Sequence, residues 1–325
     1  NSGRRINNGF IRLKHNVLEL SDRDIISYSR NITDPNGSNK LNKKFLEIIT
    51  NYLPELIVFG HADLINIKTI EFIKENYPEI KLCQWFLDRM DGEWKNNKSR
   101  FEKKMPFMDA NFCTTEPKSL NFNFKKNVFY MPNCVDRSLE KLKNYNNRFF
   151  KSDVFFAISH GVHRGILKKG KIDKRENFIN KLMDLTPNIK FDCYGVNNIQ
   201  PVWSEDFLYS ISCNKIGLNL SQGRSSNYYS SDRFSQLIGN GLLVMIDKKT
   251  KIGNFFNKNE IITYNNISDL SKKIIKYSNN DNLRKKIAKN GRDKYFKYFN
   301  SEVVAEFIIN KTFGNNKRYF WEKYL

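Results

Sequence analysis

The sequence predicts an α/β protein made of two doubly wound domains, each with a parallel sheet that helices cover on both faces. Its 325 residues exceed what one compact core usually holds and suit two domains of ordinary size. Short apolar runs alternate with longer amphipathic stretches along most of the chain, as strand–helix–strand units do. Several of these runs are nearly all apolar and rich in Val, Ile and Phe, which is typical of strands buried on both faces.

The predicted strands are short and spread along the whole chain. They span residues 16–20, 55–60, 80–86, 153–159, 189–195, 216–220, 242–246 and 261–264, and a further short strand is expected within 107–115. Amphipathic stretches that end before Pro78 and before Pro187 predict two of the intervening helices, because the residue before a proline disfavours helical backbone.

The alternation of strands and helices breaks once, in the stretch before residue 153, and we place the domain boundary near residue 150. The N-terminal domain then comprises residues 1–150 and the C-terminal domain residues 151–300. Residues 301–325 are expected to form a final helix and an aromatic tail that packs back on the N-terminal domain, because large aromatic side chains favour burial.

The first residues of the chain are typical of a segment that follows the first strand of a domain. Residues 1–5 are similar to the small-residue loop that follows a first strand, and a helix is expected from about residue 7 to residue 14. We therefore expect the first strand of the N-terminal domain to lie upstream of residue 1.

Composition argues against several classes of protein. The five cysteines include no C-x-x-C pair and there are four histidines, which disfavours a disulfide scaffold or a Cys/His zinc site and fits a reducing compartment. The longest apolar run, residues 241–246, is far shorter than the roughly 18 residues of a membrane helix. No secretion signal is recognisable at the start. We expect a cytoplasmic protein, with peripheral attachment to the inner face of the membrane as an alternative.

The net charge of +21 indicates an anionic partner. Nucleic acid, anionic lipid and phosphorylated small molecules all remain possible on charge alone. Residues 268–297 hold ten basic and three acidic side chains; they are expected to be a solvated helical face, with contact to anionic lipid headgroups as the alternative. No nucleic-acid-binding signature is present, so no nucleic-acid partner is expected.

Two polar segments are candidates for binding phosphate. Gly161 follows a predicted strand, and Arg164 and Lys168 add charge where helix N-terminal amides are expected. The alternative is a surface turn with solvated bases. The second segment runs from Asn219 to Phe234 between a strand and a helix and places hydroxyls, an arginine and helix amides together. Its alternative is a polar loop in which Ser231 or Asp232 caps the helix.

A resemblance to a known family rests on the order of several motifs. Residues 231–243 look like the R-x-F-E-x-x-x-x-G segment of the CgeB-like (spore-maturation-type) glycosyltransferases. Further similar segments are residues 192–195, 217–220, 259–264, 269–270 and 284–291. Residues 131–136 resemble the PN-x-x-D hinge of two-Rossmann (GT-B) transferases in general. The resemblance covers about residues 130–310 and the N-terminal domain only in outline.

The resemblance implies two Rossmann-like domains facing a cleft, with the donor bound by the C-terminal domain and the acceptor by the N-terminal one. Arg233 and the amides after it would face the donor diphosphate, and Asn219 the sugar or phosphates. Tyr194 and Gly195 would lie near the base. The remaining substrate-binding positions that it implies are Ser231, Asp232, Phe234 and Ser235.

One position departs from the family. Where the family has Glu after the Phe, a residue expected to bind the ribose hydroxyls, this chain has Ser235. Ribose recognition would then be weaker, mediated by water, or supplied by Asp232 or Glu260.

Ionisable side chains at two strand ends of the N-terminal domain are the catalytic candidates: His61, Asp88 and Asp91. A general base for an acceptor hydroxyl needs a pKa near the working pH, which suits histidine directly, whereas an aspartate needs burial. The structural alternatives are a histidine bonded to backbone and a loop carboxylate paired with arginine. A transferase that retains anomeric configuration needs no such base.

The resemblance therefore implies a nucleotide-sugar-dependent glycosyltransferase with a surface-glycan, lipid-linked or protein acceptor. No cofactor is expected. No Asp-x-Asp triplet stands at a strand end, which favours metal independence, although Asp88 and Asp91 come near that pattern. The alternatives are a catalytically inactive sugar-nucleotide-binding protein, suggested by Ser235, and a basic nucleic-acid-binding protein, suggested by the charge.

Overall fold

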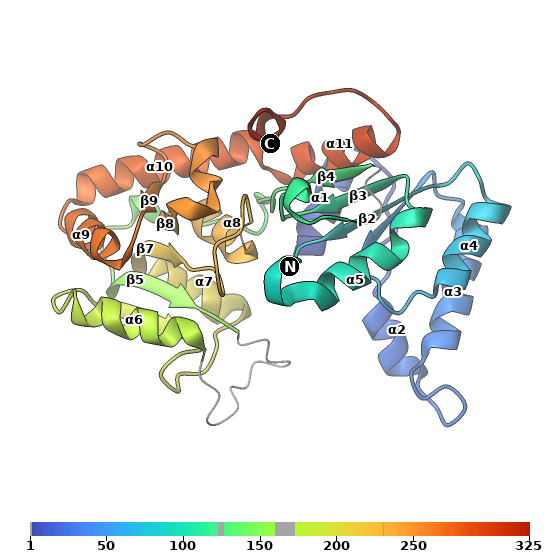
Figure 1. Cartoon of the computed structure of the whole chain (residues 1–325), viewed down its shortest axis with the longest axis horizontal. Helices are drawn as coiled ribbons and strands as arrows, with labels where there is room; N and C mark the ends of the chain where they lie inside the picture. Colours follow the sequence, from blue (N-terminus) through green and yellow to red (C-terminus); the bar gives the residue numbers. More distant parts are fainter. Residues whose placement is uncertain (1, 123–126, 160–172, 230) are drawn as a thin grey trace. The chain divides into compact units, whose positions relative to one another are not determined.

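The computed structural model describes residues 2–122, 127–159, 173–229 and 231–325 (Figure 1). These residues form two compact units. The first holds the described residues up to Pro132 together with Ser301–Lys323 and Leu325, and the second holds those of Asn133–Asn300 together with Tyr324. Each unit contains one fully parallel sheet. The predicted α/β class with two Rossmann-like parallel sheets is confirmed.

The sheet of the first unit has the order β1-β2-β3-β4. Its strands are β1 (Leu56–Gly60), β2 (Lys81–Phe86), β3 (Ala110–Cys113) and β4 (Val128–Tyr130). Its helices are α1 (Ser2–Arg12), α2 (Asp22–Ser29), α3 (Ser38–Tyr52), α4 (Ile67–Asn76), α5 (Lys95–Lys104) and α11 (Ser301–Thr312).

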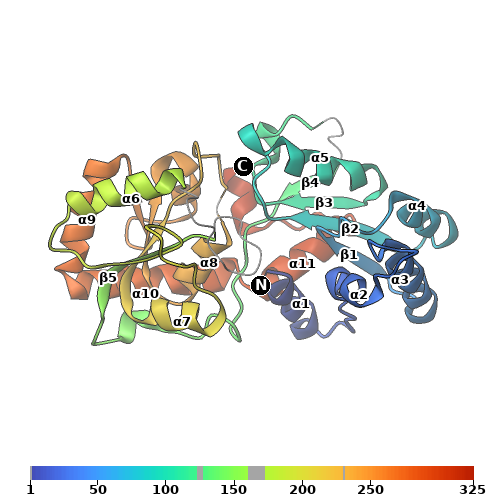
Figure 2. The ribbon, with the colours of Figure 1, turned by 90° about the horizontal axis from the view of Figure 1, so that it is seen from below.

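Successive side chains of a strand point to opposite faces of the sheet, and the two faces of this sheet pack against different helices. On β2, Gln84 donates to the carbonyl of Phe101 in α5 at 3.0 Å. The ring of Phe112, on the opposite face of β3, lies 5.4 Å from that of Phe307 in α11. Figure 2 shows α5 and α11 on opposite sides of the sheet.

Residues 16–20 are not a strand, which corrects the sequence prediction. They form the irregular connection between α1 and α2, and Leu18 is 52% exposed. Only three residues of this run are apolar, too few to cover both faces of a strand in a sheet buried on both sides. The strand β4 was not predicted, because three residues carry no periodicity to detect.

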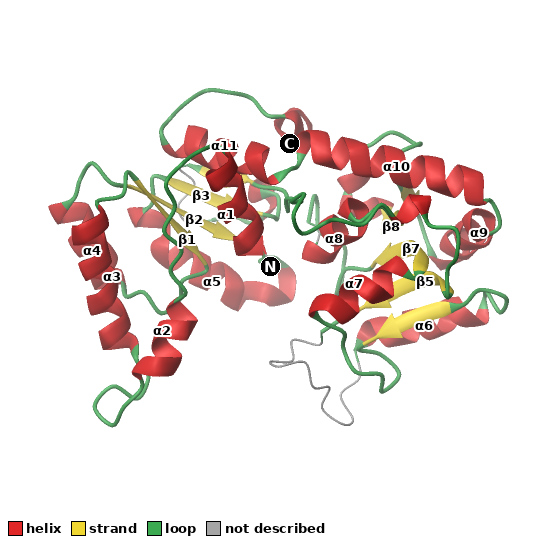
Figure 3. Ribbon diagram, turned by 180° about the vertical axis from the view of Figure 1, so that it is seen from behind, coloured by secondary structure: helices red, strands yellow, loops and turns green. Residues whose placement is uncertain are grey.

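The second unit has the strand order β6-β5-β7-β8-β9. Its strands are β5 (Ser152–Ala157), β6 (Phe191–Tyr194), β7 (Asn214–Asn219), β8 (Leu243–Asp247) and β9 (Ile262–Tyr264). Its helices are α6 (Lys174–Asp184), α7 (Ser204–Ser212), α8 (Asp232–Gly239), α9 (Ile267–Ser278) and α10 (Asp281–Tyr298). Figure 3 shows these helices flanking the strands.

Both faces of this sheet are covered. Ile179 of α6 and Leu270 of α9 share a core with Phe156 on one face, whereas the ring of Phe155 meets Phe207 of α7 at 5.4 Å on the other. The strand order reverses at β5, because β6 lies on one side of it and β7 on the other. Ligands of open parallel sheets bind outside the carboxyl ends of the strands at such a switch point.

The second unit begins earlier than the boundary expected near residue 150. The backbone amide of Val135 donates to Phe299 at 3.0 Å, and that of Asn144 donates to Asn240 at 3.0 Å. The amide side chain of Asn144 also donates to Ile211 at 3.0 Å. These bonds fix the connecting segment to the second unit. Within the part of the chain that the structure describes, no helix combines the length and apolar character needed to cross a bilayer.

Candidate functional site

The candidate site lies at the switch point of the second unit, where the end of β7 leads to the start of α8. Ser231 is the N-cap of α8, with extended backbone, but its side chain does not cap the helix. Its hydroxyl instead donates to Oδ1 of Asn219 at 3.1 Å. The first turn of α8 is therefore tied to the end of β7, and its amides receive no cap from the Ser231 side chain, although the Ser231 carbonyl accepts from the amide of Phe234 at 2.9 Å. A helix N-terminus without a side-chain cap can receive an anion.

Two buried hydrogen-bond donors at this point lack an acceptor among the described residues. They are Nδ2 of Asn219 and Nη1 of Arg233, and Asn219 is only 1% exposed. Leaving a buried donor unsatisfied costs about 1–3 kcal/mol, and more for a charged group. Such a pair persists in a folded protein when something else supplies the acceptor, and the chemistry of these donors suits an anion.

Arg233 remains a cation in this environment. Burial, reinforced by the nearby Arg175, lowers the pKa of Arg233 to about 9, with Tyr229 and Asp173 acting in the opposite direction. The guanidinium lies 5.3 Å over the ring of Phe156, which adds a cation–π contact. A pKa of about 9 still leaves the side chain charged near neutral pH.

Arg175 is a second cation at this edge, and it is not among the residues predicted from the sequence. It lies in the first turn of α6, where Asp173 caps the helix. Its guanidinium donates to both carboxylate oxygens of Asp173, at 2.8 and 2.9 Å. The sequence feature that could have placed Arg175 at a helix start is the Asp immediately before an amphipathic run. Gly161, Arg164 and Lys168, the predicted phosphate-binding residues that precede α6, lie outside the described residues.

Two predicted contacts on α8 point into the protein. Phe234 is 1% exposed and packs edge-on against Phe256 and Tyr295. Ser235 is fully enclosed, and its hydroxyl donates to the carbonyl of Asp232 at 2.8 Å. Neither side chain presents a surface to a ligand. The carboxylate of Asp232 accepts a hydrogen bond of 2.7 Å from the partly exposed Gln236.

Tyr194 and Gly195 end β6, next to the switch point. The hydroxyl of Tyr194 accepts from Ser210 of α7 at 3.0 Å. Gly195 has a φ of +75°, and a Cβ there would lie 2.0 Å from the carbonyl oxygen of Ile158. Only glycine lets these two strand ends approach so closely.

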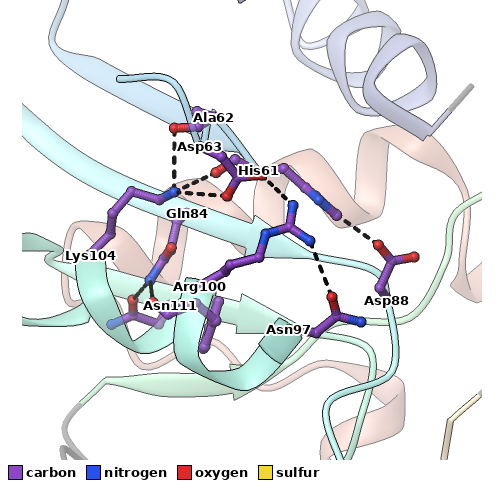
Figure 4. A network of polar contacts seen from close by, with 10 residues as sticks. His61, Ala62, Asp63, Gln84, Asp88, Asn97, Arg100, Lys104 and Asn111 are labelled. Carbon is purple, nitrogen blue, oxygen red and sulfur yellow. Dashed lines mark hydrogen bonds and ion pairs between the residues drawn. The ribbon is translucent and has the colours of Figure 1, made fainter. Parts of the chain in front are cut away.

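The first unit holds a separate network of polar side chains at the carboxyl end of its sheet (Figure 4). His61 follows β1 directly, and its ring stacks on Phe86 with centroids 4.1 Å apart and planes within 11°. Its Nε2 lies 3.9 Å from Oδ2 of Asp88. Arg100 of α5 pairs with Asp63 and donates to Asn97 at 3.1 Å.

Burial lowers the pKa of His61, and the cations Arg100 and Lys104 lower it further, whereas Asp88 and Asp63 oppose the shift. The imidazole is therefore mostly neutral at pH 7. A neutral imidazole accepts a proton, which is what a general base must do.

The turn that holds His61 is strained. His61 and Ala62 both have positive φ, at +58° and +44°, a conformation that costs L-residues roughly 1–2 kcal/mol each. Gly60, just before them, lies against Trp85, and a Cβ on it would be 2.4 Å from that ring. Strain of this kind is concentrated at functional sites.

Of the two candidate carboxylates, Asp88 and Asp91, it is Asp91 that pairs with an arginine. Both of its oxygens accept from Arg89, one of them from Nη2 at 2.9 Å, and Arg89 is 8% exposed. Asp88, by contrast, has a side chain that is 60% exposed and faces His61. The structure thus brings His61 and Asp88 together and commits Asp91 elsewhere. Among the residues that can be described, no three His, Cys, Asp or Glu side chains are grouped to hold a metal ion.

Comparisons with known proteins point in one direction. Residues 174–310, less than half of the chain, match the family described as "Glycosyl transferase-like". No curated protein matches the sequence significantly.

Similar solved structures match over most of the chain. TarM has a TM-score of 0.57 at 15% identity over 85% of this chain and 58% of its own. AviGT4, a glycosyltransferase involved in avilamycin A biosynthesis, has a TM-score of 0.57 at 9% identity, covering 96% and 88%. Anabaena HepE, solved with UDP, has a TM-score of 0.52 at 11% identity, covering 85% and 82%. The chain spans less than three fifths of the length of TarM. At such identities the likeness is one of fold.

Proposed function

We propose that this protein is a glycosyltransferase that moves a sugar from a nucleotide diphosphate sugar to a hydroxyl group of an acceptor. The observation that carries the proposal is the pair of donors Arg233 Nη1 and Asn219 Nδ2 at the switch point of the second unit, which have no acceptor among the described residues. The matched family segment, residues 174–310, includes both. HepE and a variant of S. aureus TarM, which are similar in fold, were solved with UDP.

The donor diphosphate would occupy the space in front of α8. Arg233 and the amide of Asn219 would donate to its oxygens, and the amides at the start of α8 would add the helix dipole. Arg175 is a further cation near Arg233, and Arg164 and Lys168, which lie outside the described residues, are proposed to add positive charge. Donors fixed before the reaction stabilise the charge that develops on the leaving diphosphate. We propose that these cations make a metal ion unnecessary and that no cofactor is used.

Ribose recognition is assigned to a different residue from the one first expected. Counted from Arg233, the R-x-F-E pattern places Gln236, not Ser235, at the position of the Glu. Ser235 is enclosed, whereas Gln236 is partly exposed and bonded to Asp232. We propose that Asp232 and Gln236 together take over the ribose contact. The serine is then no argument for a protein that has lost catalysis.

The acceptor would be activated in the first unit by His61, with Asp88 facing its imidazole. The acceptor is proposed to be a surface glycan, a lipid-linked sugar or a protein. We propose a cytoplasmic location, and a lipid-linked acceptor would bring the enzyme to the inner face of the membrane. Several lysines of α9 and α10 are neutralised by ion pairs, such as Lys273 with Asp269 at 2.9 Å and Lys285 with Asp281 at 2.7 Å, so any such attraction would rest on the remaining ones.

The experiment that tests donor binding is a thermal-shift panel of UDP, GDP, CMP, dTDP and ADP, each with and without magnesium. A ligand at about 100 times its Kd adds about 2.7 kcal/mol, enough to raise Tm measurably. One nucleotide should stabilise the wild type and fail to stabilise Arg233→Ala. The matched control is Arg148→Ala, which removes an exposed arginine of the same unit. The absence of a Tm shift with every nucleotide, or an equal Tm shift in Arg233→Ala, would contradict the proposal. Hydrolysis of the matching sugar nucleotide separates an enzyme from an inactive binding protein.

A further inference from the structure

Lys104, the last residue of α5, has a buried side chain. The side chain is only 5% exposed, although lysines near a surface usually extend their ammonium groups into solvent. Its neighbour Lys103 is exposed. A buried ammonium is retained when acceptors surround it, so the contacts of Lys104 identify what it holds.

The acceptors around Lys104 all belong to the turn after β1. Its Nζ donates to the carbonyl of His61 and lies 3.4 Å from that of Ala62. The carboxylate of Asp63 is 3.8 Å away. Two carbonyl groups and one carboxylate, from three successive residues of the turn, therefore surround one ammonium, as Figure 4 shows.

The same turn is the strained one. His61 and Ala62 have positive φ, which places their carbonyl groups on the side of α5. Besides these contacts, the amide of Ala62 donates to Gly60 at 2.7 Å, that of His61 donates to Trp85 at 3.4 Å, and the carbonyl of Ala62 accepts from the amide of Ile65 at 3.3 Å. The ammonium is the contact that ties both strained carbonyls to a helix.

We propose that Lys104 is a positioning residue that clamps this turn and thereby aims the imidazole of His61 at Asp88 and the acceptor. The inference rests on the proposed role of His61 as general base. The charged groups that face His61 are Asp63 on its own turn, Asp88 after β2, and Arg100 and Lys104 on α5. Loss of the clamp would release the turn while leaving Arg233 and Asn219 untouched.

The test is the titration of His61 by imidazole NMR in the full chain, without substrate. The variants are Lys104→Met, which keeps the length of the side chain but no donor, and Lys103→Met as its matched control; His61→Gln assigns the signal. The midpoint for His61 should move upward in Lys104→Met, because a cation is lost and the ring becomes more exposed, and should not move in Lys103→Met. An unchanged His61 titration in a folded Lys104→Met protein would overturn the proposal.

A second variant covers the case in which Lys104→Met does not fold. Glycine adopts positive φ without strain, so Ala62→Gly should restore folding to Lys104→Met if holding the turn is what Lys104 does. Failure of that rescue would overturn the proposal as well. With donor and acceptor present, kcat of Lys104→Met should fall about 10- to 100-fold with an unchanged donor KM, the size expected for a misplaced group. A shifted titration with an unchanged kcat would retain the clamp and refute His61 as the base.

Discussion

Nε2 of His61 lies 3.9 Å from Oδ2 of Asp88, at the carboxyl ends of adjacent strands. The two side chains differ in exposure, 24% for His61 and 60% for Asp88. The histidine is the more buried of the two, and burial lowers its pKa, whereas the carboxylate beside it is the more exposed group. Proton abstraction needs a base that is neutral before the reaction and a nearby carboxylate that stabilises the protonated form of that base.

His61→Gln is predicted to lower kcat by about 100- to 10,000-fold, the usual contribution of a general base. The nucleotide affinity should stay the same, because Arg233 and Asn219 are unchanged. Single-turnover kinetics with the donor found in the nucleotide panel would measure this, with the exposed His15→Gln as control. A kcat close to that of the control would show that His61 is not the base.

Asp88→Asn is predicted to move the acidic limb of the profile of kcat/KM against pH to lower pH. Burial lowers the pKa of His61, and the charge of Asp88 raises it, so removing that charge lowers the pKa further. The wild-type limb should lie below the ordinary value of 6.5, with activity constant as the pH rises through 7. A limb that moves to higher pH in Asp88→Asn would contradict the assignment.

Most strands, and the part of the site that contains Asn219 and Arg233, could be predicted from the sequence. Apolar runs such as 242–246 have no polar residues to expose and must be covered on both faces, so their position is determined locally. Asn219 and Arg233 flank a strand end and a helix start, where the topology brings residues together.

Lys104 shows what local sequence does not reveal. It ends the run Lys95–Lys104, which has four lysines and an arginine and resembles a solvated helical face. Its burial depends on the carbonyl groups of a strained turn 43 residues earlier in the chain. The buried donors of Asn219 and Arg233, which find no acceptor in the described part of the chain, likewise appear only once their surroundings are in place.

Gly60→Ala is predicted to destabilise the first unit by about 1–3 kcal/mol, the cost of overpacking, because the new Cβ would meet Trp85 at 2.4 Å. Gly3→Ala is the matched control, since its Cβ would meet the same ring at an ordinary 3.8 Å and alanine is the better helix former. Urea unfolding would compare the two variants. Equal stability of Gly60→Ala and wild type would mean that Trp85 moves freely.

Asp63→Asn is predicted to reduce the fall in the free energy of unfolding as the pH is lowered. Burial alone would raise the pKa of Asp63, but its bond to Arg100 and the charges of Arg100 and Lys104 outweigh burial and hold the pKa below 3.8. The charged form is therefore stabilised by folding, and its contribution is present above about pH 4 and lost as the pH falls further. Urea unfolding at about pH 7, 5 and 3.5 should show a smaller fall for Asp63→Asn than for wild type or for the exposed Glu47→Gln. A parallel fall would show that the pair contributes nothing.

Asn219→Asp is predicted to weaken binding of the nucleoside diphosphate by about 100-fold, or about 2.7 kcal/mol, because it replaces a donor with a negative charge beside the proposed diphosphate. The hydroxyl of Ser231 donates to Oδ1 of Asn219, and a carboxylate accepts that bond equally well, so the fold should be kept. Calorimetry with the nucleoside diphosphate and with the matching nucleoside separates the phosphate from the base: only the diphosphate should lose affinity. Asn146→Asp adds the same charge at an exposed position of the same unit and should leave both affinities unchanged. Equal losses for nucleoside and diphosphate would place the phosphates elsewhere.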